Sequence, residues 1–335
     1  MCLCGERLYR QGEIRFLTDK LRNKRTMVFA QSGFGKTNLV KVLLYNMISN
    51  KDYGKLVFDL NGEYALRGTS TYGLGDIDEA LVKQNLVVYT DKELPRTYKD
   101  ADRFIFGGKV RLNMHRNLSV GDILNFGAGF SEVMKSFLFY LDEEGVENFV
   151  QNIDDYVENP ANLHRDFSDF FGKMEKKGEE ASARKTVMAI RKRIRHLIDD
   201  DKGLHSSSSK LVEDVFKYLQ QGKTIVIDLS LRDNIEASII STILIRKLFE
   251  QNKENFTSQR TDKVIKAVVF VEEAQNVLSD EFVKINANPF VRLAKEGRKF
   301  GLGIVAITQR PSAISEEIRT QAENFFAFLW ETQMI

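Results

Sequence analysis

"VFAQSGFGKTNLV", from Val28 to Val40, is the stretch of sequence that decides the fold. Its centre, Gly35-Lys36-Thr37, matches the end of the phosphate-binding pattern G-x-x-x-x-G-K-[ST], although Ala30 stands where that pattern has glycine. An apolar run precedes the motif and a helical pattern follows it, which is the context that a phosphate loop requires. We therefore interpret the stretch as a working nucleotide-binding loop rather than a chance match.

The residues of this loop have the chemistry that a bound nucleotide needs. Gly33 and Gly35 let backbone N–H groups approach phosphate oxygens without interference from Cβ atoms. Lys36 would reach the β- and γ-phosphates, and the Thr37 hydroxyl would bind Mg²⁺. Alanine at position 30 is tolerated if its φ angle is negative. The predicted nucleotide-binding residues are Ser32, Gly33, Phe34, Gly35, Lys36, Thr37 and Asn38.

Composition narrows the class of protein. The chain has 335 residues, of which 43% are hydrophobic and 29% charged, as in soluble globular proteins. Its net charge of +2 means that any nucleic-acid contact must come from a local basic patch. Cys2 and Cys4 indicate free thiols in a reducing compartment, because one C-x-C pair cannot close a zinc site. No apolar run approaches the roughly 20 residues of a membrane span, so we expect a cytoplasmic protein.

Short apolar runs alternate with helical patterns along much of the chain, which predicts a mostly parallel α/β sheet. Leu39, Leu43 and Met47 line one face of a helix directly after the phosphate loop. The predicted strands are Thr26–Phe29, Lys55–Phe58, Asn85–Tyr89, Thr224–Ile227, Ala267–Val271 and Gly303–Ile307, with Asn324–Trp330 as a candidate seventh.

The middle of the chain lacks strand signals. Helical spacing is evident in Leu118–Asn125, Phe130–Leu141 and Ala183–Ile198. We therefore expect residues 117–221 to form a helical insertion in the α/β core. Residues 1–116 would supply the first part of that core, and residues 222–335 the second part.

Three of the predicted strands end in acidic residues, which a phosphate loop needs for metal binding and for activating water. Asp228 best matches the local pattern of four apolar residues followed by aspartate. Asp59 ends another strand, and the adjacent pair Glu272-Glu273 ends a third. Neighbours in a strand point to opposite sides, so one member of that pair could hold Mg²⁺ while the other reaches the attacking water. The next strand places Thr308-Gln309 at the same edge of the sheet, suited to sensing a γ-phosphate.

Five motifs together resemble the HerA branch of the FtsK–HerA ATPase superfamily: "SGFGKTN", "FDLNGEY", "TIVIDLS", "VFVEEAQNV" and "AKEGRKFGLGIVAITQRPS". The resemblance covers the chain from about Glu6 to its end, and the last motif is the most specific. It implies a RecA-like P-loop NTPase core and a homo-oligomeric, hexameric ring. It further implies that ATP drives double-stranded DNA through the ring, beside a nuclease or other effector, in DNA processing or phage defence.

The resemblance also implies roles for individual residues, position by position. Lys36 and Thr37 would bind phosphate and metal, Glu272 would be the metal-side acid, Glu273 the catalytic acid, Gln309 the sensor, and Arg298 an arginine finger that reaches a neighbour's nucleotide. Lys24 and Arg25 are weaker candidates for such contacts. Ala30, and Glu272 in place of the family's usual aspartate, depart from the family pattern. A preceding β-barrel domain and further sequence after "TQRPS" are incomplete, so we expect a fragment or a minimal relative.

Several alternatives stay open from sequence. The basic helix that contains Arg184, Lys185, Arg191, Lys192, Arg193 and Arg195 is either a DNA-facing surface or an ordinary solvated helix face, and composition favours the second. The chain could also be a secretion or conjugation ATPase of the same superfamily. A third hypothesis is a nucleotide-binding ring that acts as a scaffold for an effector enzyme.

Overall fold

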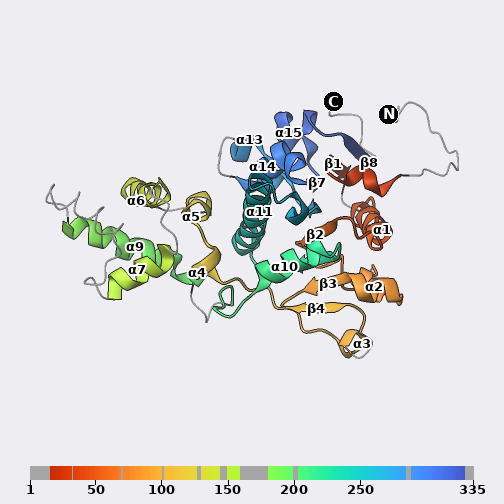
Figure 1. Cartoon of the computed structure of the whole chain (residues 1–335), viewed down its shortest axis with the longest axis horizontal. Coiled ribbons are helices and arrows are strands. Elements are labelled where there is room, and N and C mark those ends of the chain that lie inside the picture. The colour runs from red at the N-terminus through yellow and green to blue at the C-terminus, as the bar shows by residue number, and fades with distance from the viewer. Residues whose placement is uncertain are drawn as a thin grey trace.

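A parallel sheet of eight strands forms the centre of the protein (Figure 1). The computed structural model describes residues 16–31, 33–68, 71–99, 102–126, 130–143, 149–158, 180–198, 203–283 and 288–328. The strands are β1 (Arg25–Ala30), β2 (Gly54–Asp59), β3 (Leu86–Tyr89), β4 (Ile105–Gly108), β5 (Thr224–Asp228), β6 (Ala267–Val271), β7 (Leu302–Thr308) and β8 (Asn324–Phe328). The predicted mostly parallel α/β fold is therefore confirmed.

The strands lie in the order β4-β3-β5-β2-β6-β7-β1-β8, and each adjacent pair is parallel. All carboxyl ends therefore meet at one edge of the sheet, and β7 lies between β1 and β6. The sequence did not predict β4. That strand is a short edge strand, "IFGG", and its two glycines leave no apolar run by which to recognise it.

Helices cover both faces of the sheet. On one face α1 (Lys36–Met47) and α2 (Ala80–Asn85) pack on alternate strand residues such as Val28 and Val57. On the other face α10, α11 and α14 pack on residues such as Met27 and Leu56. The remaining described helices are α3 (Arg96–Lys99), α4 (Met114–Asn117), α5 (Val120–Phe126), α6 (Glu132–Glu143), α7 (Phe149–Glu158), α9 (Glu180–Ile198), α10 (Leu211–Gln220), α11 (Asn234–Thr257), α12 (Gln275–Leu278), α13 (Asp280–Val283), α14 (Pro289–Glu296) and α15 (Glu316–Thr320), with 3-10 turns η1 (Thr18–Leu21), η2 (Leu74–Asp76), η5 (Thr261–Lys263), η6 (Gly297–Phe300) and η7 (Pro311–Ala313).

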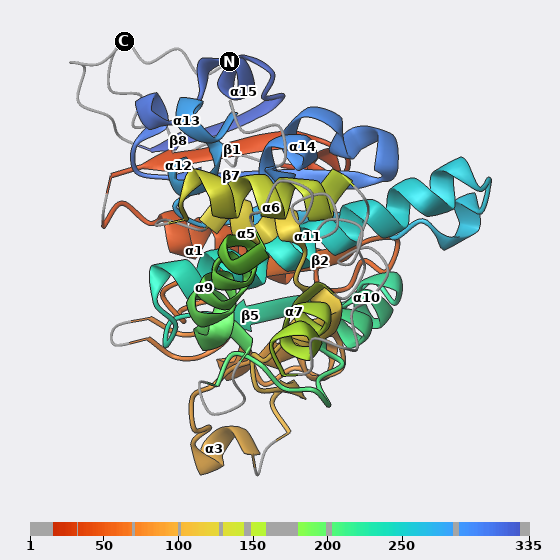
Figure 2. The ribbon, with the colours of Figure 1, turned by 90° about the vertical axis from the view of Figure 1, so that its left-hand side faces the viewer.

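Helices α4, α5, α6, α7 and α9 form an arm that extends from one side of the sheet (Figures 1 and 2). The two crossings between core and arm pair with each other, since the Leu112 N–H donates to the Leu204 carbonyl (2.9 Å) and the Ser206 N–H donates to the Leu112 carbonyl (3.0 Å). His115 stacks on His205 at the same place, with ring centroids 4.7 Å apart. Helix α10 lies within the predicted insertion but packs against β2 and β5. The division into core and insertion stays a prediction.

The described part of the chain contains no helix that is both long enough and apolar enough to cross a membrane. The longest of the described helices, α11, carries charged residues near its start and throughout its second half, and it packs between the sheet and the arm.

An ion pair between Asp122 of α5 and Arg246 of α11 joins the arm to the core. The Arg246 Nη2 lies 2.7 Å from one Asp122 carboxylate oxygen, and Nε lies 3.0 Å from the other. Asp122 also accepts a hydrogen bond from the Ser119 N–H at 2.8 Å. The Asp122 side chain is 1% exposed and that of Arg246 is 13% exposed, so neither charge can be compensated fully by water.

We predict that Asp122→Ala lowers the free energy of unfolding by about 2 kcal/mol, because it removes the buried partner of Arg246 and leaves only Glu250, which is 48% exposed, as its counter-charge. Chemical denaturation measures this change. The matched control is Glu132→Ala in α6, which removes an ion pair with Lys135 from a side chain that is 87% exposed. That control is expected to cost about 0.5 kcal/mol or less. Equal, small effects of both variants would contradict the proposed role of the Asp122–Arg246 pair.

Candidate nucleotide-binding site

The predicted phosphate loop connects the end of β1 to the start of α1. Gly33 and Gly35 have positive φ angles of 82° and 88°, a backbone conformation that favours glycine. A Cβ atom added to either glycine would meet no atom within 4 Å, so the space beside the loop is open. Phe34 and Asn38 are exposed, whereas Ser32 lies outside the described residues. The loop therefore has the backbone shape and the free space that a phosphate group requires.

Ala30, the departure from the glycine pattern, is the last residue of β1 and is fully buried. Its φ angle is not positive, since the described non-glycine residues with positive φ do not include it. An alanine in extended strand conformation carries no left-handed strain. The substitution is therefore compatible with the backbone of the loop.

Lys36 is the first residue of α1, and its Nζ donates a hydrogen bond to the Ala30 carbonyl at 3.1 Å. Partial burial lowers the pKa of Lys36, while the carboxyl groups of Glu273 and Glu272 act in the opposite direction. Thr37 follows in the first turn of the same helix and is partly exposed. The predicted phosphate-binding cation thus lies within electrostatic range of both predicted acids.

Glu273 follows β6 at the carboxyl edge of the sheet and faces the end of β7. Its two carboxylate oxygens accept hydrogen bonds from Gln275 Nε2 at 2.6 Å and from Gln309 Nε2 at 3.2 Å. The Thr308 hydroxyl in turn donates to Gln275 Oε1 at 2.5 Å. Glu273 has a φ angle of 45°, which is rare for a residue with a side chain and costs on the order of 1 kcal/mol. Packing therefore holds Glu273 in a strained conformation beside the predicted sensor, Gln309.

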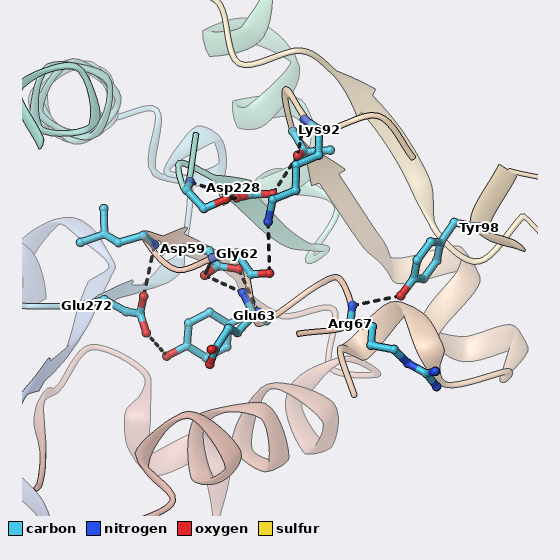
Figure 3. Close-up of polar contacts among 12 residues, drawn as sticks. Asp59, Gly62, Glu63, Arg67, Lys92, Tyr98, Asp228 and Glu272 are labelled. Carbon is cyan, nitrogen blue, oxygen red and sulfur yellow. Dashed lines mark hydrogen bonds and ion pairs between the residues drawn. The ribbon is translucent and has the colours of Figure 1, made fainter. Parts of the chain in front are cut away.

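Glu272 points to the other side, toward the segment that follows β2 (Figure 3). Its Oε1 accepts a hydrogen bond from the Tyr64 hydroxyl at 2.9 Å. Its Oε2 accepts from the Leu60 N–H at 3.2 Å and from Asn61 Nδ2 at 3.3 Å. Burial raises the pKa of Glu272 to about 8, and the nearby Asp59 adds to this rise, whereas the hydrogen bond from Tyr64 opposes it. The two adjacent glutamates thus occupy opposite sides of the strand end.

Asp59, at the end of β2, organises the backbone that follows it. Its carboxylate accepts hydrogen bonds from the N–H groups of Gly62 (2.7 Å), Glu63 (3.1 Å) and Tyr64 (2.9 Å). Burial raises the pKa of Asp59 to about 6, although these three hydrogen bonds act against the rise. The position of Tyr64 therefore depends on Asp59.

Asp228, the acid with the best local sequence match, lies at the end of β5. It accepts hydrogen bonds from Thr90 Oγ1 at 2.7 Å and from Ser230 Oγ at 2.6 Å. Lys92 Nζ lies 3.3 Å from the same carboxylate. Because β2, β6 and β7 separate β5 from β1, Asp228 lies away from the phosphate loop.

Arg298 lies in η6, at the amino end of β7, whereas Gln309 follows the carboxyl end of that strand. Seven residues of strand separate the two ends by about 20 Å. The Arg298 side chain is 66% exposed, and Nη1 lies 3.6 Å from Glu323 Oε1. Lys24 and the Arg25 N–H contact the same Glu323 carboxylate, each at 2.9 Å. The structure therefore does not bring Arg298 together with the phosphate loop of its own chain.

Sequence reasoning gave no role to Tyr64, Gln275 or Lys41, although the first two lie in the quoted motifs "FDLNGEY" and "VFVEEAQNV". Lys41 is a buried cation of α1, and its Nζ donates to Thr71 Oγ1 at 3.1 Å and to the Tyr72 carbonyl at 2.9 Å. It fastens the segment after β2 to the helix of the phosphate loop. A lysine at a helix position that faces the core was the one available signal for this contact.

Comparisons with known proteins show which proteins this chain is similar to. The family model described as "Helicase HerA, central domain" matches residues 5–248, and that of the zonular occludens toxin (Zot) matches residues 176–329. The DNA double-strand break repair helicase HerA of Sulfurisphaera tokodaii is 26% identical over 315 residues, which cover 93% of this chain and 56% of that protein. The protein of the same name from Sulfolobus acidocaldarius is 23% identical, covering 90% of this chain and 54% of that protein. The chain thus spans about half the length of these relatives.

Solved structures with a similar arrangement include the plasmid coupling protein TrwB in complex with ADPNP, with a TM-score of 0.47 and 11% identity, covering 88% of this chain and 66% of that one. VirB4 of Thermoanaerobacter pseudethanolicus has a TM-score of 0.45 and 12% identity, covering 94% of this chain and 76% of that one. The family model matches well over half of the chain, which confirms the resemblance first drawn from five short motifs. The chain belongs to the family of the HerA helicase central domain.

Proposed function

We propose that this chain is the ATP-hydrolysing part of a HerA-type ring motor that binds double-stranded DNA and translocates it. The observation that carries the proposal is the contact between Glu273 and Gln309 at the same sheet edge as Lys36. A general base, a polar sensor and a phosphate-binding cation are the groups that nucleotide hydrolysis needs, and here they come from three adjacent strands.

The described residues fit ATP and Mg²⁺. The open space at Gly33 and Gly35 leaves room for phosphate oxygens, and the start of α1 presents its backbone N–H groups to them. Thr37 and Glu272 would hold Mg²⁺, which when bound neutralises the charge that develops on the phosphate oxygens. Lys36 would exchange its hydrogen bond to the Ala30 carbonyl for the β- and γ-phosphates.

Glu273 would act on the attacking water. Its carboxylate accepts the water proton while the new oxygen–phosphorus bond forms and the bond between the β- and γ-phosphates breaks, releasing ADP and phosphate. The hydrogen bonds from Gln275 and Gln309 fix the direction in which this carboxylate points. Gln309 would then respond to the presence of the γ-phosphate.

We predict distinct effects of two substitutions on Mg²⁺-dependent ATP hydrolysis. Lys36→Ala abolishes tight nucleotide binding, because the phosphates lose their cation. Glu273→Gln retains binding but lowers turnover by a factor of roughly 10² or more, because an amide cannot accept the proton of the water. Equilibrium binding of a fluorescent ATP analogue and release of phosphate measure the two effects separately.

Asp228→Asn is the matched control for Glu273→Gln, since it also replaces a carboxylate at a strand end by an amide. Its contacts to Thr90 and Lys92 lie on the far side of β2, so we expect folded Asp228→Asn protein to hydrolyse ATP. If Glu273→Gln turned over normally while Asp228→Asn did not, the assignment of the catalytic acid to β6 would be wrong.

We also propose an active site shared between subunits, which the position of Arg298 supports. This side chain lies about 20 Å from its own phosphate loop by the length of β7, yet it is exposed at the opposite edge of the sheet. In a homo-oligomeric ring, such as the hexamer that the family resemblance implies, an exposed arginine at that edge could reach a neighbour's nucleotide. Arginine fingers in other enzymes contribute about 10³-fold or more in rate.

We predict that Arg298→Ala alone and Lys36→Ala alone are each inactive, and that mixing the two variants restores part of the ATPase activity. Restoration is expected because some interfaces of the mixed ring pair an intact Arg298 with an intact Lys36. ATPase activity of the mixture, measured on size-fractionated oligomer, tests this. A fully active monomer would contradict the shared site.

A DNA contact is supported by the charge distribution on α9. Its buried face, which includes Val187 and Ile194, packs on α6 and α7. Its exposed residues include Arg184, Lys185 and Lys192, and no described carboxylate lies within ion-pair distance of these three. The sequence from residue 181 to 198 has no acidic residue, so the cations on this face repel each other. Phosphate groups of a duplex would relieve that repulsion.

We predict sequence-insensitive binding to duplex DNA that weakens steeply with salt. Each phosphate contact contributes about 0.9 to the slope of log affinity against log salt concentration, so Lys192→Ala is expected to reduce that slope by about one per bound subunit. Lys253→Ala, an equally exposed lysine on α11, is the matched control and leaves the slope unchanged. Binding of a labelled duplex at several salt concentrations measures both.

The same measurement separates this proposal from its rivals. An unchanged slope for Lys192→Ala would remove α9 from the DNA contact and leave the contact to other residues of the ring. Absence of DNA binding by a confirmed ring, with ATP hydrolysis intact, would favour a scaffold that organises an effector enzyme. From the family resemblance we also propose that a nuclease or other effector is a partner. The same resemblance supports a role in DNA processing or phage defence.

A further inference from the structure

The carboxylate of Asp59 holds the backbone of the segment that follows it, Leu60–Tyr64, which we call the β2 loop. Asp59 accepts hydrogen bonds from three consecutive N–H groups of this loop, between 2.7 and 3.1 Å, and the Asp59 side chain is fully buried. Three such bonds hold the backbone of a segment that belongs to no helix or strand, and the Leu74 N–H of η2 adds a fourth by donating to the Tyr64 carbonyl at 2.8 Å. The backbone from which Tyr64 extends is therefore well fixed.

The outer side of the β2 loop lies against the Lys92 and Ser230 side chains, and Lys92 Nζ donates to the Gly62 carbonyl at 3.5 Å. Gly62 has a φ angle of 68°, and a Cβ atom there would lie 2.0 Å from Lys92 Nζ and 2.6 Å from Ser230 Oγ. Lys92 is in turn held by Asp228 at 3.3 Å. Figure 3 shows this arrangement, in which Lys92 and Asp228 lie on one side of the β2 loop and Glu272 lies on the other. The β2 loop thus lies between the ends of β5 and β6.

The β2 loop presents donors to both oxygens of Glu272. The Tyr64 hydroxyl donates to Oε1 at 2.9 Å, while the Leu60 N–H and Asn61 Nδ2 donate to Oε2 at 3.2 and 3.3 Å. Tyr64 is fully buried, so its hydroxyl has no competing water. A glutamate side chain has three rotatable bonds, and donors at both oxygens select one orientation of its carboxyl group.

We propose that Tyr64 is a positioning residue that fixes the carboxyl group of Glu272 for binding the Mg²⁺ of the nucleotide. This inference rests on the proposed function, in which Glu272 is the metal-side acid. In this proposal Tyr64 contacts Glu272 and is not itself a ligand of the nucleotide or the metal. It acts through Glu272, as groups that hydrogen-bond a metal ligand do in other metal sites.

The test uses the whole chain and two buried tyrosines, one before β2 and one in the β2 loop that follows it. Tyr64→Phe removes the hydroxyl that contacts Glu272. Tyr53→Phe removes the hydroxyl of a tyrosine that is 2% exposed, immediately precedes β2 and contacts Asp19 at 3.4 Å. For each variant, binding of a fluorescent ATP analogue is measured over a range of Mg²⁺ concentrations, and thermal unfolding is measured in parallel.

We expect Tyr64→Phe to raise the Mg²⁺ concentration at half-saturation about 10-fold or more, the usual effect of losing a partner of a metal ligand. Tyr53→Phe is expected to leave that concentration unchanged. If Tyr64→Phe behaved like the wild-type chain, the inference would be overturned while the proposed function stood. Wild-type chain that binds the analogue with no dependence on Mg²⁺ would overturn both.

A double-mutant cycle distinguishes positioning from simple packing. In a Glu272→Gln background, Tyr64→Phe is expected to have no further effect on Mg²⁺ dependence, because the group through which it acts has been neutralised. The same 10-fold change in both backgrounds would show that Tyr64 acts by packing and would overturn the inference. Should Tyr64→Phe unfold the protein, Asn61→Ala removes an exposed donor to the same carboxylate, and a smaller shift in the same direction is expected.

Discussion

The parallel pairing of β7 with β1 on one side and with β6 on the other is the constraint on which the candidate site depends. It places the ends of three strands next to each other, so that the phosphate loop, the Glu272-Glu273 pair and Gln309 share one edge. Parallel strands buried on both faces leave little freedom to slide, because a shift of one residue would exchange the two buried sets of side chains. The fixed register of these strands therefore fixes the relative positions of the residues at their carboxyl ends.

Two adjacent glutamates receive opposite environments at this edge. Glu272 is buried, with three donors from the β2 loop around its carboxyl group. Glu273 is partly exposed and held by two glutamine side chains in a strained backbone conformation. Such strain persists only where the surroundings over-determine the conformation, as the hydrogen bond from the Ala274 N–H to the Ile307 carbonyl helps to do. Glu272 and Glu273 are thus adjacent in the chain but differ in burial and in hydrogen-bond partners.

The two ends of the parallel strands carry residues with different proposed roles. The carboxyl edge carries the groups that would bind and hydrolyse the nucleotide, and the amino edge carries Arg298 close to Glu323. The helical arm lies to one side, joined to the core through paired crossings and through the buried contact of Asp122 with Arg246. Because this contact reaches α11, whose N-terminus follows β5, the arm and the sheet have a continuous physical connection.

The sequence by itself determined the elements that local pattern encodes: the phosphate loop, seven of the strands and the family motifs. It placed acids at three strand ends; local pattern favoured Asp228, whereas the family resemblance assigned the metal-side and catalytic roles to Glu272 and Glu273. Strand order adds that only β7 lies between β6, which Glu272 and Glu273 follow, and β1, whereas three strands separate β5, which ends in Asp228, from β1. Strand order depends on burial between segments far apart in the chain, which no short window of sequence contains. The hydrogen bond between Tyr64 and Glu272, residues 208 positions apart, was likewise decided only by the tertiary structure.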